Sequence, residues 1–427
     1  MKVTLPYGRS DLDVELPDDV DVFLPVSTPT LPDPQGTVRQ ALAHPLNSRP
    51  LHDLVRPTDS VAIVISDITR PVPNRTLIPP ILETLAAADV PRERVVIVNG
   101  TGMHRANSRD ELAIMLGEEV VDNYRIVNHD ARDRSTLVYL PANGRSAEVR
   151  VNRDYLEADL KILTGFIEPH IFAGYSGGGK AILPGICGAE TILSNHSFAF
   201  LADPNATWCR ADDNPLFQDI RKVALATRPS FIVNVTLNEK KVITGVFAGE
   251  MVAAHDAGIA QAARQALKPI PHLYDIAVTT NLGWPADLNL YQSMKGMSVA
   301  AQAVKKGGKI VIAAECAEAI GNDDFLDLLR SGPSYPALME KIGAPGFAAD
   351  EQWGVQCIGM VWERAEIYLY SAMSREVVED EAHLHYCADV SATVAALAEE
   401  YRRANDGREP TICVLPYGQL TVPRLQP

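Results

Sequence analysis

The sequence has few cysteines, and they are scattered. Its 427 residues include six cysteines, and no two of them form a C-x-x-C pair or a spacing typical of a metal site. They are therefore expected to be reduced residues of the core. The six are Cys187, Cys209, Cys316, Cys357, Cys387 and Cys413.

Long apolar runs are also missing. No stretch approaches the roughly 18 apolar residues of a membrane-spanning helix. The opening MKVTLP leads directly into strand-like sequence, without the apolar segment of a signal peptide. We therefore expect a cytoplasmic protein with no membrane contact.

Basic residues are fewer than acidic ones. The chain has 39 Lys and Arg against 54 Asp and Glu, which gives a net charge of -15. Such a charge repels polyanions, so nucleic acid is excluded as a partner, although a few local basic groups can still bind a small anion. With 46% hydrophobic and 22% charged residues, the composition is that of a globular protein with a large core.

Short runs of β-branched residues alternate with helical patterns along most of the chain, which is typical of parallel sheets built from strand–helix–strand units. The predicted fold class is α/β, with two domains that each contain a mainly parallel sheet flanked by helices. Residues 76–88 are predicted to form the crossover helix between the first two strands. The clearest predicted strands are residues 60–66, 94–98, 159–164, 231–235, 275–279 and 309–313.

A domain boundary is predicted at residues 268–272, KPIPH, where two prolines interrupt the pattern before a new strand. We expect an N-terminal domain of residues 1–268 and a C-terminal α/β domain of residues 273–405. The tail sequence TICVLPYG echoes the opening VTLPYG. Residues 410–427 are therefore expected to return to the first domain as a strand.

Three unusual loops each follow directly on a predicted strand. They are DITRP at residues 67–71, NGTGMH at residues 99–104, and a glycine-rich loop at residues 165–180. Ligands of open α/β sheets bind outside the carboxyl ends of the strands. The three loops are therefore expected to converge on one site.

The glycine-rich loop, GFIEPHIFAGYSGGGK, is the most informative segment. Ser176 and the three glycines after it are expected to bring backbone N–H groups around a phosphate, because glycine permits positive φ and close approach. Lys180 would then lie at the anion. The segment fits G-x-x-x-x-G-K, but Ala181 replaces the hydroxyl residue through which a P-loop holds Mg²⁺, so a phosphotransferase is the weaker alternative.

Three of the ten histidines, His104, His170 and His196, lie in or just beyond these loops. A single histidine is more often structural than catalytic, but three on one rim are better explained by chemistry. Imidazole has an ordinary pKa of about 6.5 and can act as a neutral base or as a metal ligand.

A helix with a core-facing stripe is predicted in the second domain. Tyr291 and Lys295, four residues apart, share the face beside this stripe, and Asp287 is a candidate N-cap. The helix would direct its first turns toward a strand-end crevice, although a surface Tyr–Lys pair is the ordinary alternative. The stripe consists of Leu290, Met294, Met297, Ala301 and Val304.

Together these segments resemble the lactate racemase family of nickel-pincer nucleotide enzymes. The resemblance covers about 230 residues in both predicted domains. It rests on SDITRP at residues 66–71, GMH at 102–104, EPH and SGGGK within 168–180, SNH at 194–196 and YQSMKG at 291–296.

The resemblance implies a 2-hydroxy acid racemase or epimerase with its active site in a cleft between the domains. It also implies a cofactor made of a pyridinium-derived mononucleotide that holds nickel, and proteins that build this cofactor. Lys180 matches the lysine that tethers the cofactor covalently, and His196 matches the nickel ligand. The predicted catalytic residues are His104 and His170 as bases, with Arg70 and Lys295 beside the substrate. The predicted cofactor contacts are Lys180, Ser176, Gly177, Gly178, Gly179, Asp67, Tyr291 and Gln292, although Asp67 has the alternative role of capping its own loop.

The implied mechanism needs two bases. One histidine takes the proton of the 2-hydroxyl group while the C2 hydrogen leaves as hydride, and the second histidine supplies a proton after hydride returns to the other face. The predicted substrate is a short 2-hydroxy monocarboxylate held by Arg70 and Lys295. The alternatives are a P-loop phosphotransferase and a non-catalytic protein that binds a small acid. Trp284 and Trp353 are expected to be either pocket walls or core residues.

Overall fold

The computed structural model describes residues 1–141 and 148–426, which form two compact units. Unit 1 comprises residues 1–26, 197–202 and 265–427, and unit 2 comprises residues 27–196 and 203–264. Each unit contains a six-stranded sheet flanked by helices, so the predicted two-domain α/β class is confirmed.

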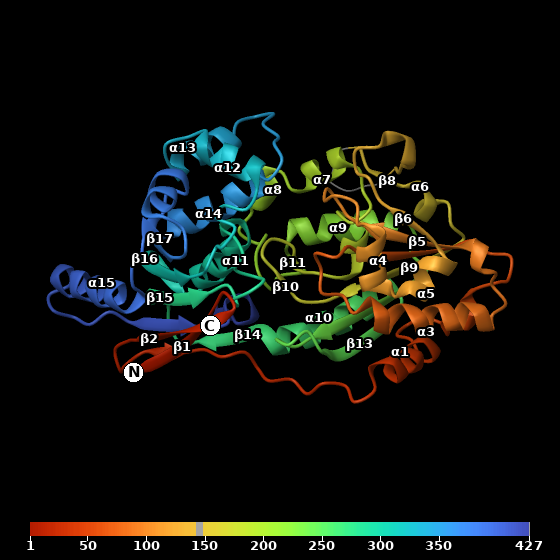
Figure 1. The fold of residues 1–427 in the computed structure, drawn as a ribbon, viewed down its shortest axis with the longest axis horizontal. Helices are drawn as coiled ribbons and strands as arrows, with labels where there is room; N and C mark the ends of the chain where they lie inside the picture. The colour runs from red at the N-terminus through yellow and green to blue at the C-terminus, as the bar shows by residue number, and fades with distance from the viewer. Residues whose placement is uncertain (142–147, 427) are drawn as a thin grey trace. The chain divides into compact units, whose positions relative to one another are not determined.

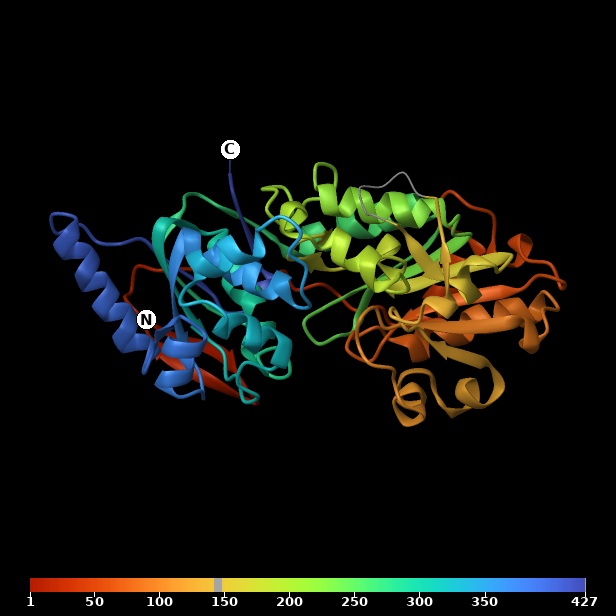
Figure 2. The ribbon, with the colours of Figure 1, turned by 90° about the horizontal axis from the view of Figure 1, so that it is seen from above.

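The sheet of unit 2 has the order β13-β12-β9-β4-β5-β6. All neighbours are parallel except β12 and the edge strand β13. Figure 2 shows orange strands from early in the chain beside yellow and green strands from later in it. The strands are β4 (Val61–Ser66), β5 (Val95–Gly100), β6 (Arg125–Asn128), β9 (Leu160–Phe166), β12 (Phe231–Leu237) and β13 (Ile243–Gly249).

The central strands of unit 2 are buried on both faces, as parallel strands between helices must be. All five residues from Val61 to Ile65 are at most 1% exposed. The predicted crossover helix is α3 (Asn74–Ala87), whose Leu77, Ile78 and Ile81 pack in the same core cluster as Ile63. The other main helices are α1 (Pro34–Ala43), α4 (Arg109–Leu116), α5 (Glu118–Asn123), α7 (Ala189–Asn195), α9 (Pro215–Ala226) and α10 (Met251–Ala266).

The sheet of unit 1 is parallel throughout, with the order β18-β17-β16-β15-β19-β3. Its strands are β3 (Asp21–Val22), β15 (Tyr274–Thr280), β16 (Val304–Ala313), β17 (Ala365–Tyr370), β18 (His385–Tyr386) and β19 (Ile412–Leu415). Figure 1 shows α12, α13 and α14 grouped together in this unit. The helices are α11 (Leu290–Ala301), α12 (Asp323–Arg330), α13 (Tyr335–Ile342), α14 (Gln352–Arg364) and α15 (Val390–Ala404).

The two ends of the chain differ from the domain prediction. The first 26 residues belong with the C-terminal part of the chain and not with residues 27–196. The hairpin of β1 (Lys2–Tyr7) and β2 (Ser10–Glu15) explains this, because its apolar residues pack in one core cluster with β15 and α15. Figure 1 shows this red hairpin beside β15.

The C-terminal tail also differs from the prediction. It stays in unit 1, where β19 inserts between β15 and β3, and β20 (Val422–Leu425) pairs with β14 (Leu267–Ile270). The fully apolar sequence ICVL suits a strand buried on both faces, and all four of these residues are buried. Pro427, the last residue of the predicted strand, lies outside the described residues.

The N-cap of α11 is also corrected. Asn289, and not Asp287, caps the helix, since its side chain accepts the N–H of Gln292. The fully buried carboxylate of Asp287 instead accepts the N–H groups of Gly8 and Glu315, at 2.7 and 3.0 Å. Asp287 therefore ties the start of the chain to the segment before α11.

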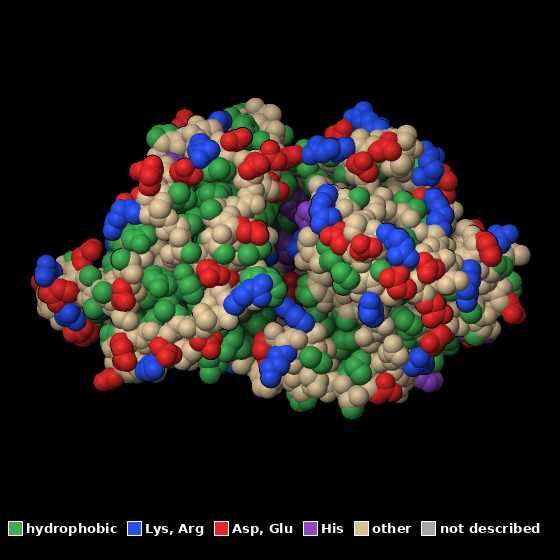
Figure 3. Space-filling view, viewed as in Figure 1, with side chains coloured by type: hydrophobic (Ala, Val, Ile, Leu, Met, Phe, Trp, Pro, Cys, Tyr) green, Lys and Arg blue, Asp and Glu red, His purple; other side chains and the backbone are tan. Residues whose placement is uncertain are grey.

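None of the described helices is long and apolar enough to span a membrane. Figure 3 shows basic and acidic side chains interspersed over the face in view, and not gathered into a basic patch among the described residues of that face.

Candidate functional site

The three loops singled out in the sequence follow β4, β5 and β9, which are neighbours in the sheet of unit 2. Their carboxyl ends lie along one edge, where ligands of such sheets bind. The N–H of Gly102, after β5, donates to the carbonyl of Gly185, just beyond the glycine-rich loop, at 2.9 Å. Two of the predicted loop regions are therefore in direct contact.

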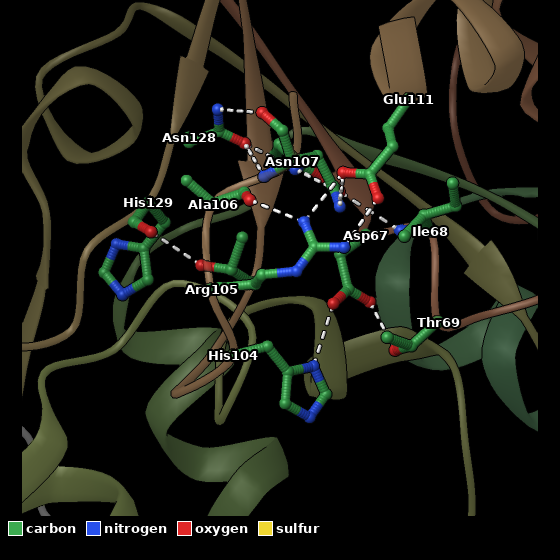
Figure 4. A network of polar contacts seen from close by, with 12 residues as sticks. Asp67, Ile68, Thr69, His104, Arg105, Ala106, Asn107, Glu111, Asn128 and His129 are labelled. Atoms are coloured by element: carbon green, nitrogen blue, oxygen red, sulfur yellow. Dashed lines mark hydrogen bonds and ion pairs between the residues drawn. The ribbon is translucent and has the colours of Figure 1, made fainter. Parts of the chain in front are cut away.

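Asp67 and His104 form a carboxylate–imidazole pair at this edge, as Figure 4 shows. The Asp67 Oδ2 and His104 Nδ1 atoms are 2.8 Å apart, and the Asp67 side chain is only 3% exposed. Burial by itself would raise the pKa of Asp67, but the hydrogen bond and charge of His104 and the hydrogen bond of Thr69 hold it below its ordinary value. Asp67 is therefore a buried carboxylate that remains ionised.

The pair fixes the tautomer of the His104 ring. An ionised carboxylate can only accept, so Nδ1 must donate its hydrogen to Asp67. The other nitrogen, Nε2, then carries a lone pair in the neutral ring. Because the His104 side chain is 46% exposed, this lone pair is accessible to a proton donor.

Asp67 also closes its own loop, which was the alternative role predicted for it. Its carboxylate accepts the hydroxyl of Thr69 at 2.7 Å, and its carbonyl accepts the N–H of Arg70 at 3.1 Å. The exposed Arg70 guanidinium lies near enough for its charge to lower the pKa of Asp67 further. Arg70, Asp67 and His104 are thus brought together, as predicted.

The glycine-rich loop contains β10 (Pro169–His170), β11 (Gly174–Tyr175) and a short 3₁₀ turn, η3 (Gly178–Ala181). Gly177 and Gly178 have φ of 80° and 51°, values that favour glycine. A side chain at position 177 would overlap Ile167, and one at position 178 would overlap the ring of His255. Glycine is therefore required at both positions.

The predicted phosphate cradle is corrected in one respect. The N–H of Gly178 donates to Asn234 Oδ1 at 2.7 Å, and the N–H of Ser176 donates to the carbonyl of Glu168 at 2.9 Å. The Ser176 hydroxyl is likewise bound to the carbonyl of Phe166. Since these donors are used within the protein, an anion at this loop must be bound by other groups.

His170 and Lys180 meet at the mouth of the loop, with His170 Nε2 and Lys180 Nζ 3.1 Å apart. The Nδ1 atom of His170 accepts the N–H groups of Phe172 and Ala173, at 3.3 and 3.1 Å. Since Nδ1 is an acceptor, the neutral His170 ring carries its hydrogen on Nε2. The contact places the Lys180 amine directly against this ring nitrogen.

His196 follows α7 and is 9% exposed. Burial, followed by the charge of Lys180, lowers the pKa of His196 to about 3. The ring is therefore neutral at physiological pH, which is the state that binds metals. Among the described residues, no three His, Cys, Asp or Glu side chains converge as a metal cluster.

The remaining predicted residues lie together on α11 in unit 1. Lys295 Nζ donates to Gln292 Oε1 at 2.9 Å, and the hydroxyl of Tyr291 accepts the indole N–H of Trp353 at 2.7 Å. Trp353 therefore holds the Tyr291 ring from α14. Trp284 is not a core residue, since it is 47% exposed, and the guanidinium of Arg9 lies over its ring.

Sequence reasoning missed the buried polar residues behind the loops. Asn234 interrupts the apolar strand FIVNVTL and receives the Gly178 N–H, while His255 Nε2 donates to the carbonyl of Ser176 at 2.9 Å. The signal for Asn234 was one amide within a strand buried on both faces. Nothing in the sequence marked His255 as a site residue, because it lies in α10, far along the chain from the glycine-rich loop that it contacts.

The stability of the protein is expected to depend on His255 below neutral pH. Burial lowers the pKa of His255 to about 4, whereas an unfolded histidine titrates at about 6.5. Between these values the unfolded state binds more protons, so stability rises with pH by up to about 1.4 kcal/mol per pH unit. His255→Gln keeps a donor for Ser176 and should reduce this slope.

Urea unfolding of parent and variant at pH 5 and pH 7 measures the slope. The control is His44→Gln, which changes an exposed histidine and should leave the slope unchanged. Equal slopes for His255→Gln and the parent would contradict the assignment.

Two domain families match this chain, one in its N-terminal half and one in its C-terminal half. The lactate racemase N-terminal domain matches residues 7–209, and the lactate racemase C-terminal domain matches residues 271–422. The lactate racemase of Thermoanaerobacterium thermosaccharolyticum is 32% identical over 402 residues, which cover 92% of this chain and 91% of that protein. The lactate racemase of Lactiplantibacillus plantarum is 33% identical over 387 residues, or 90% and 89% of the two chains.

Solved structures lead to the same family as the sequence comparisons. The lactate racemase apoprotein from T. thermosaccharolyticum superimposes with a TM-score of 0.90 at 31% identity, over 99% of this chain and 100% of that one. A Thermotoga maritima protein with a TM-score of 0.66 and 16% identity, over 95% and 100% of the two chains, shares the fold alone. The chain therefore belongs to the lactate racemase family, and it is an isomerase of the racemase type.

Proposed function

We propose that this protein racemises a short 2-hydroxy monocarboxylate such as lactate, with a nickel-pincer nucleotide as its cofactor. The observation that carries the proposal is the complementary state of its two histidines. His104 presents a lone pair at Nε2 because Asp67 holds its Nδ1 hydrogen, whereas His170 presents a hydrogen at Nε2 because its Nδ1 accepts two backbone N–H groups. Racemisation through a keto acid needs one group that accepts the hydroxyl proton and one that returns a proton.

In this scheme His104 accepts the proton of the substrate hydroxyl at Nε2. The carboxylate of Asp67, whose side chain is only 3% exposed, stabilises the imidazolium that forms. After the planar keto acid presents its other face, His170 in its protonated, imidazolium form would donate the proton at Nε2 to the new hydroxyl oxygen and become neutral. General acid–base help of this kind contributes about 10²–10⁴-fold. The opposite enantiomer requires the opposite protonation of the two rings.

The residues at the glycine-rich loop suit the proposed cofactor. The Lys180 amine lies against His170 at this loop, where it would form the covalent bond to the cofactor. His196 would be the nickel ligand, because its buried ring is neutral and a neutral imidazole can bind nickel. When bound, the cofactor supplies the acceptor for the C2 hydride.

The positive groups support an anionic substrate. Arg70 is exposed next to the Asp67–His104 pair, and its planar guanidinium can hold a carboxylate through two hydrogen bonds. Lys295 would add a second positive charge from α11, and Tyr291 and Gln292 would be polar neighbours of the substrate and cofactor. A neutral imidazole can deprotonate an alcohol as hydride leaves, whereas an amino acid would keep a protonated amino group near neutral pH.

The substrate class is tested with protein made in cells that carry the cofactor-building proteins. Single enantiomers of lactate, 2-hydroxybutyrate, malate and alanine are incubated with the loaded enzyme and separated by chiral chromatography. Lactate and 2-hydroxybutyrate should reach an equal mixture of enantiomers, and alanine should remain unchanged. Inversion of alanine without inversion of any hydroxy acid would overturn the assignment.

The phosphotransferase alternative has little support. In a P-loop the lysine opens a helix whose N-terminus binds phosphate, whereas Lys180 lies within a four-residue 3₁₀ turn. The alternative of a non-catalytic acid-binding protein gives no reason for a buried carboxylate behind an exposed imidazole. The same chromatography separates it from the racemase, because such a protein leaves every enantiomer intact.

A further inference from the structure

A cluster of three asparagines lies behind the Asp67–His104 pair. Asn99 is the residue before Gly100, the last residue of β5. Asn128 is the last residue of β6, and Asn107 lies in the loop after His104. The Nδ2 of Asn99 donates to Oδ1 of both Asn107 and Asn128, at 2.9 and 2.8 Å. Asn99 is fully buried and Asn107 is 5% exposed, so these hydrogen bonds are shielded from water.

Asn107 is the centre of this cluster, and Figure 4 shows its amide between two loops. Its Oδ1 accepts the backbone N–H of Ile68 at 3.2 Å, and its Nδ2 donates to Glu111 Oε2 at 3.1 Å. Its own backbone N–H and carbonyl are both bound by the Asn128 amide, at 3.1 and 3.0 Å. One residue therefore fixes its own loop and reaches across to the next.

The two ends of this bridge are adjacent to the reacting groups. Ile68 is the residue after Asp67, and Asn107 is three residues after His104. The loop with His104 is also held by the ion pair of Arg105 with Glu111, at 2.6 Å, and by the hydrogen bond from the Gly102 N–H to the Gly185 carbonyl, at 2.9 Å. The Asn107–Ile68 hydrogen bond joins the loop of the imidazole to the loop of its carboxylate.

We propose that Asn107 is a positioning residue, which holds the His104 loop against the Asp67 loop so that the imidazole meets the carboxylate before substrate arrives. The proposal rests on the role of His104 in the proposed function. A preformed pair keeps the Nε2 lone pair of His104 at one position. Displacement of a reacting group by about 1 Å costs on the order of 10²-fold in rate.

Asn107→Leu tests this, since it keeps the approximate volume and removes both polar atoms. Asn107→Asp keeps the acceptor for Ile68 and Asn99 but replaces the donor to Glu111 with a second carboxylate oxygen. Asp389→Ala is the matched control, because it removes a side chain that caps α15 in unit 1 and has no contact with the His104 loop. All three variants lose at least one hydrogen bond from a side chain.

The first readout needs no cofactor. Histidines of the apoprotein are labelled with ¹⁵N, and the long-range ¹H–¹⁵N spectrum reports which ring nitrogen of His104 carries hydrogen. The parent, Asp389→Ala and Asn107→Asp should show His104 with hydrogen on Nδ1 and slow exchange with water. In Asn107→Leu the Nδ1 hydrogen should exchange rapidly, while circular dichroism shows a folded protein. If Asn107→Leu does not fold, Asn107→Asp carries the test and must retain the slow Nδ1 signal.

The second readout is the racemisation rate of the loaded enzyme. We expect kcat of Asn107→Leu to fall by about 10²-fold with KM changed by less than about threefold, and a smaller loss for Asn107→Asp. A His104 spectrum and kcat in Asn107→Leu equal to those of Asp389→Ala would overturn the proposal, as would equal losses in the Leu and Asp variants. If the parent racemises no hydroxy acid but Asn107→Leu still frees the Nδ1 hydrogen, the proposed function fails and the positioning role stands.

Discussion

Lys180→Ala is expected to abolish racemisation and to remove any covalent mass addition from the protein. The reason is that Lys180 supplies the amine next to His170 to which the cofactor would be attached. Loss of one side-chain hydrogen bond lowers stability by only about 1 kcal/mol, so the variant should fold. Intact-mass analysis and chiral chromatography, on protein made with the cofactor-building proteins present, measure both effects.

Two further variants make this result specific. Lys222→Ala changes an exposed lysine of α9 and should keep both mass addition and activity. His196→Ala should keep the mass addition but lose nickel in metal analysis, since its imidazole would be the protein's ligand to the metal. A mass addition that persists in Lys180→Ala would show that the tether is elsewhere.

Asp67→Asn is expected to lower kcat by about 10²–10⁴-fold, which is the range of general acid–base catalysis. An asparagine side chain can turn its NH₂ group toward Nδ1 of His104, and the ring then carries its hydrogen on Nε2. The lone pair that accepts the substrate proton would be lost, and so would the charge that stabilises the imidazolium. Steady-state rates in both directions measure the effect, with thermal unfolding as the check on folding.

A double-variant comparison tests whether Asp67 acts through His104. If it does, Asp67→Asn should cost little further activity in a His104→Ala background, because residues that act as a unit are strongly non-additive. Fully additive losses would mean that Asp67 has a separate role, such as the direct cofactor contact predicted from the sequence.

The regular parts of the fold were predictable because burial imposes a simple pattern. Strands buried on both faces read as continuous apolar runs, and all six predicted strands appear within a few residues of their expected bounds. The chain ends were not predictable in this way. The opening VTLPYG pattern predicts a strand, but it does not indicate whether that strand packs in the core of unit 1 or of unit 2.

The sequence predicted that the loops after β4, β5 and β9 converge, but not which side chains contact each other across these loops. The sequence does not indicate that Asp67 contacts His104, because this contact depends on the register in which β4 pairs with β5. The hydrogen bonds of Asn107 and of Asn234 also join segments that are distant in the sequence, so they could not be predicted from it either. The cytoplasmic location, the cleft between the domains and the roles of the α11 residues stay predictions.

The strand order of unit 1 has a consequence for synthesis of the protein. Among the described residues, the edge strand β3, at residues 21–22, has β19 at residues 412–415 as its partner, and β19 is also the neighbour of β15. During translation β3 must therefore wait for nearly the whole chain, whereas the sheet of unit 2 is complete once β13 has emerged. Unit 2 should fold first, and unit 1, with its contacts between the two ends of the chain, should close last and depend more on chaperones.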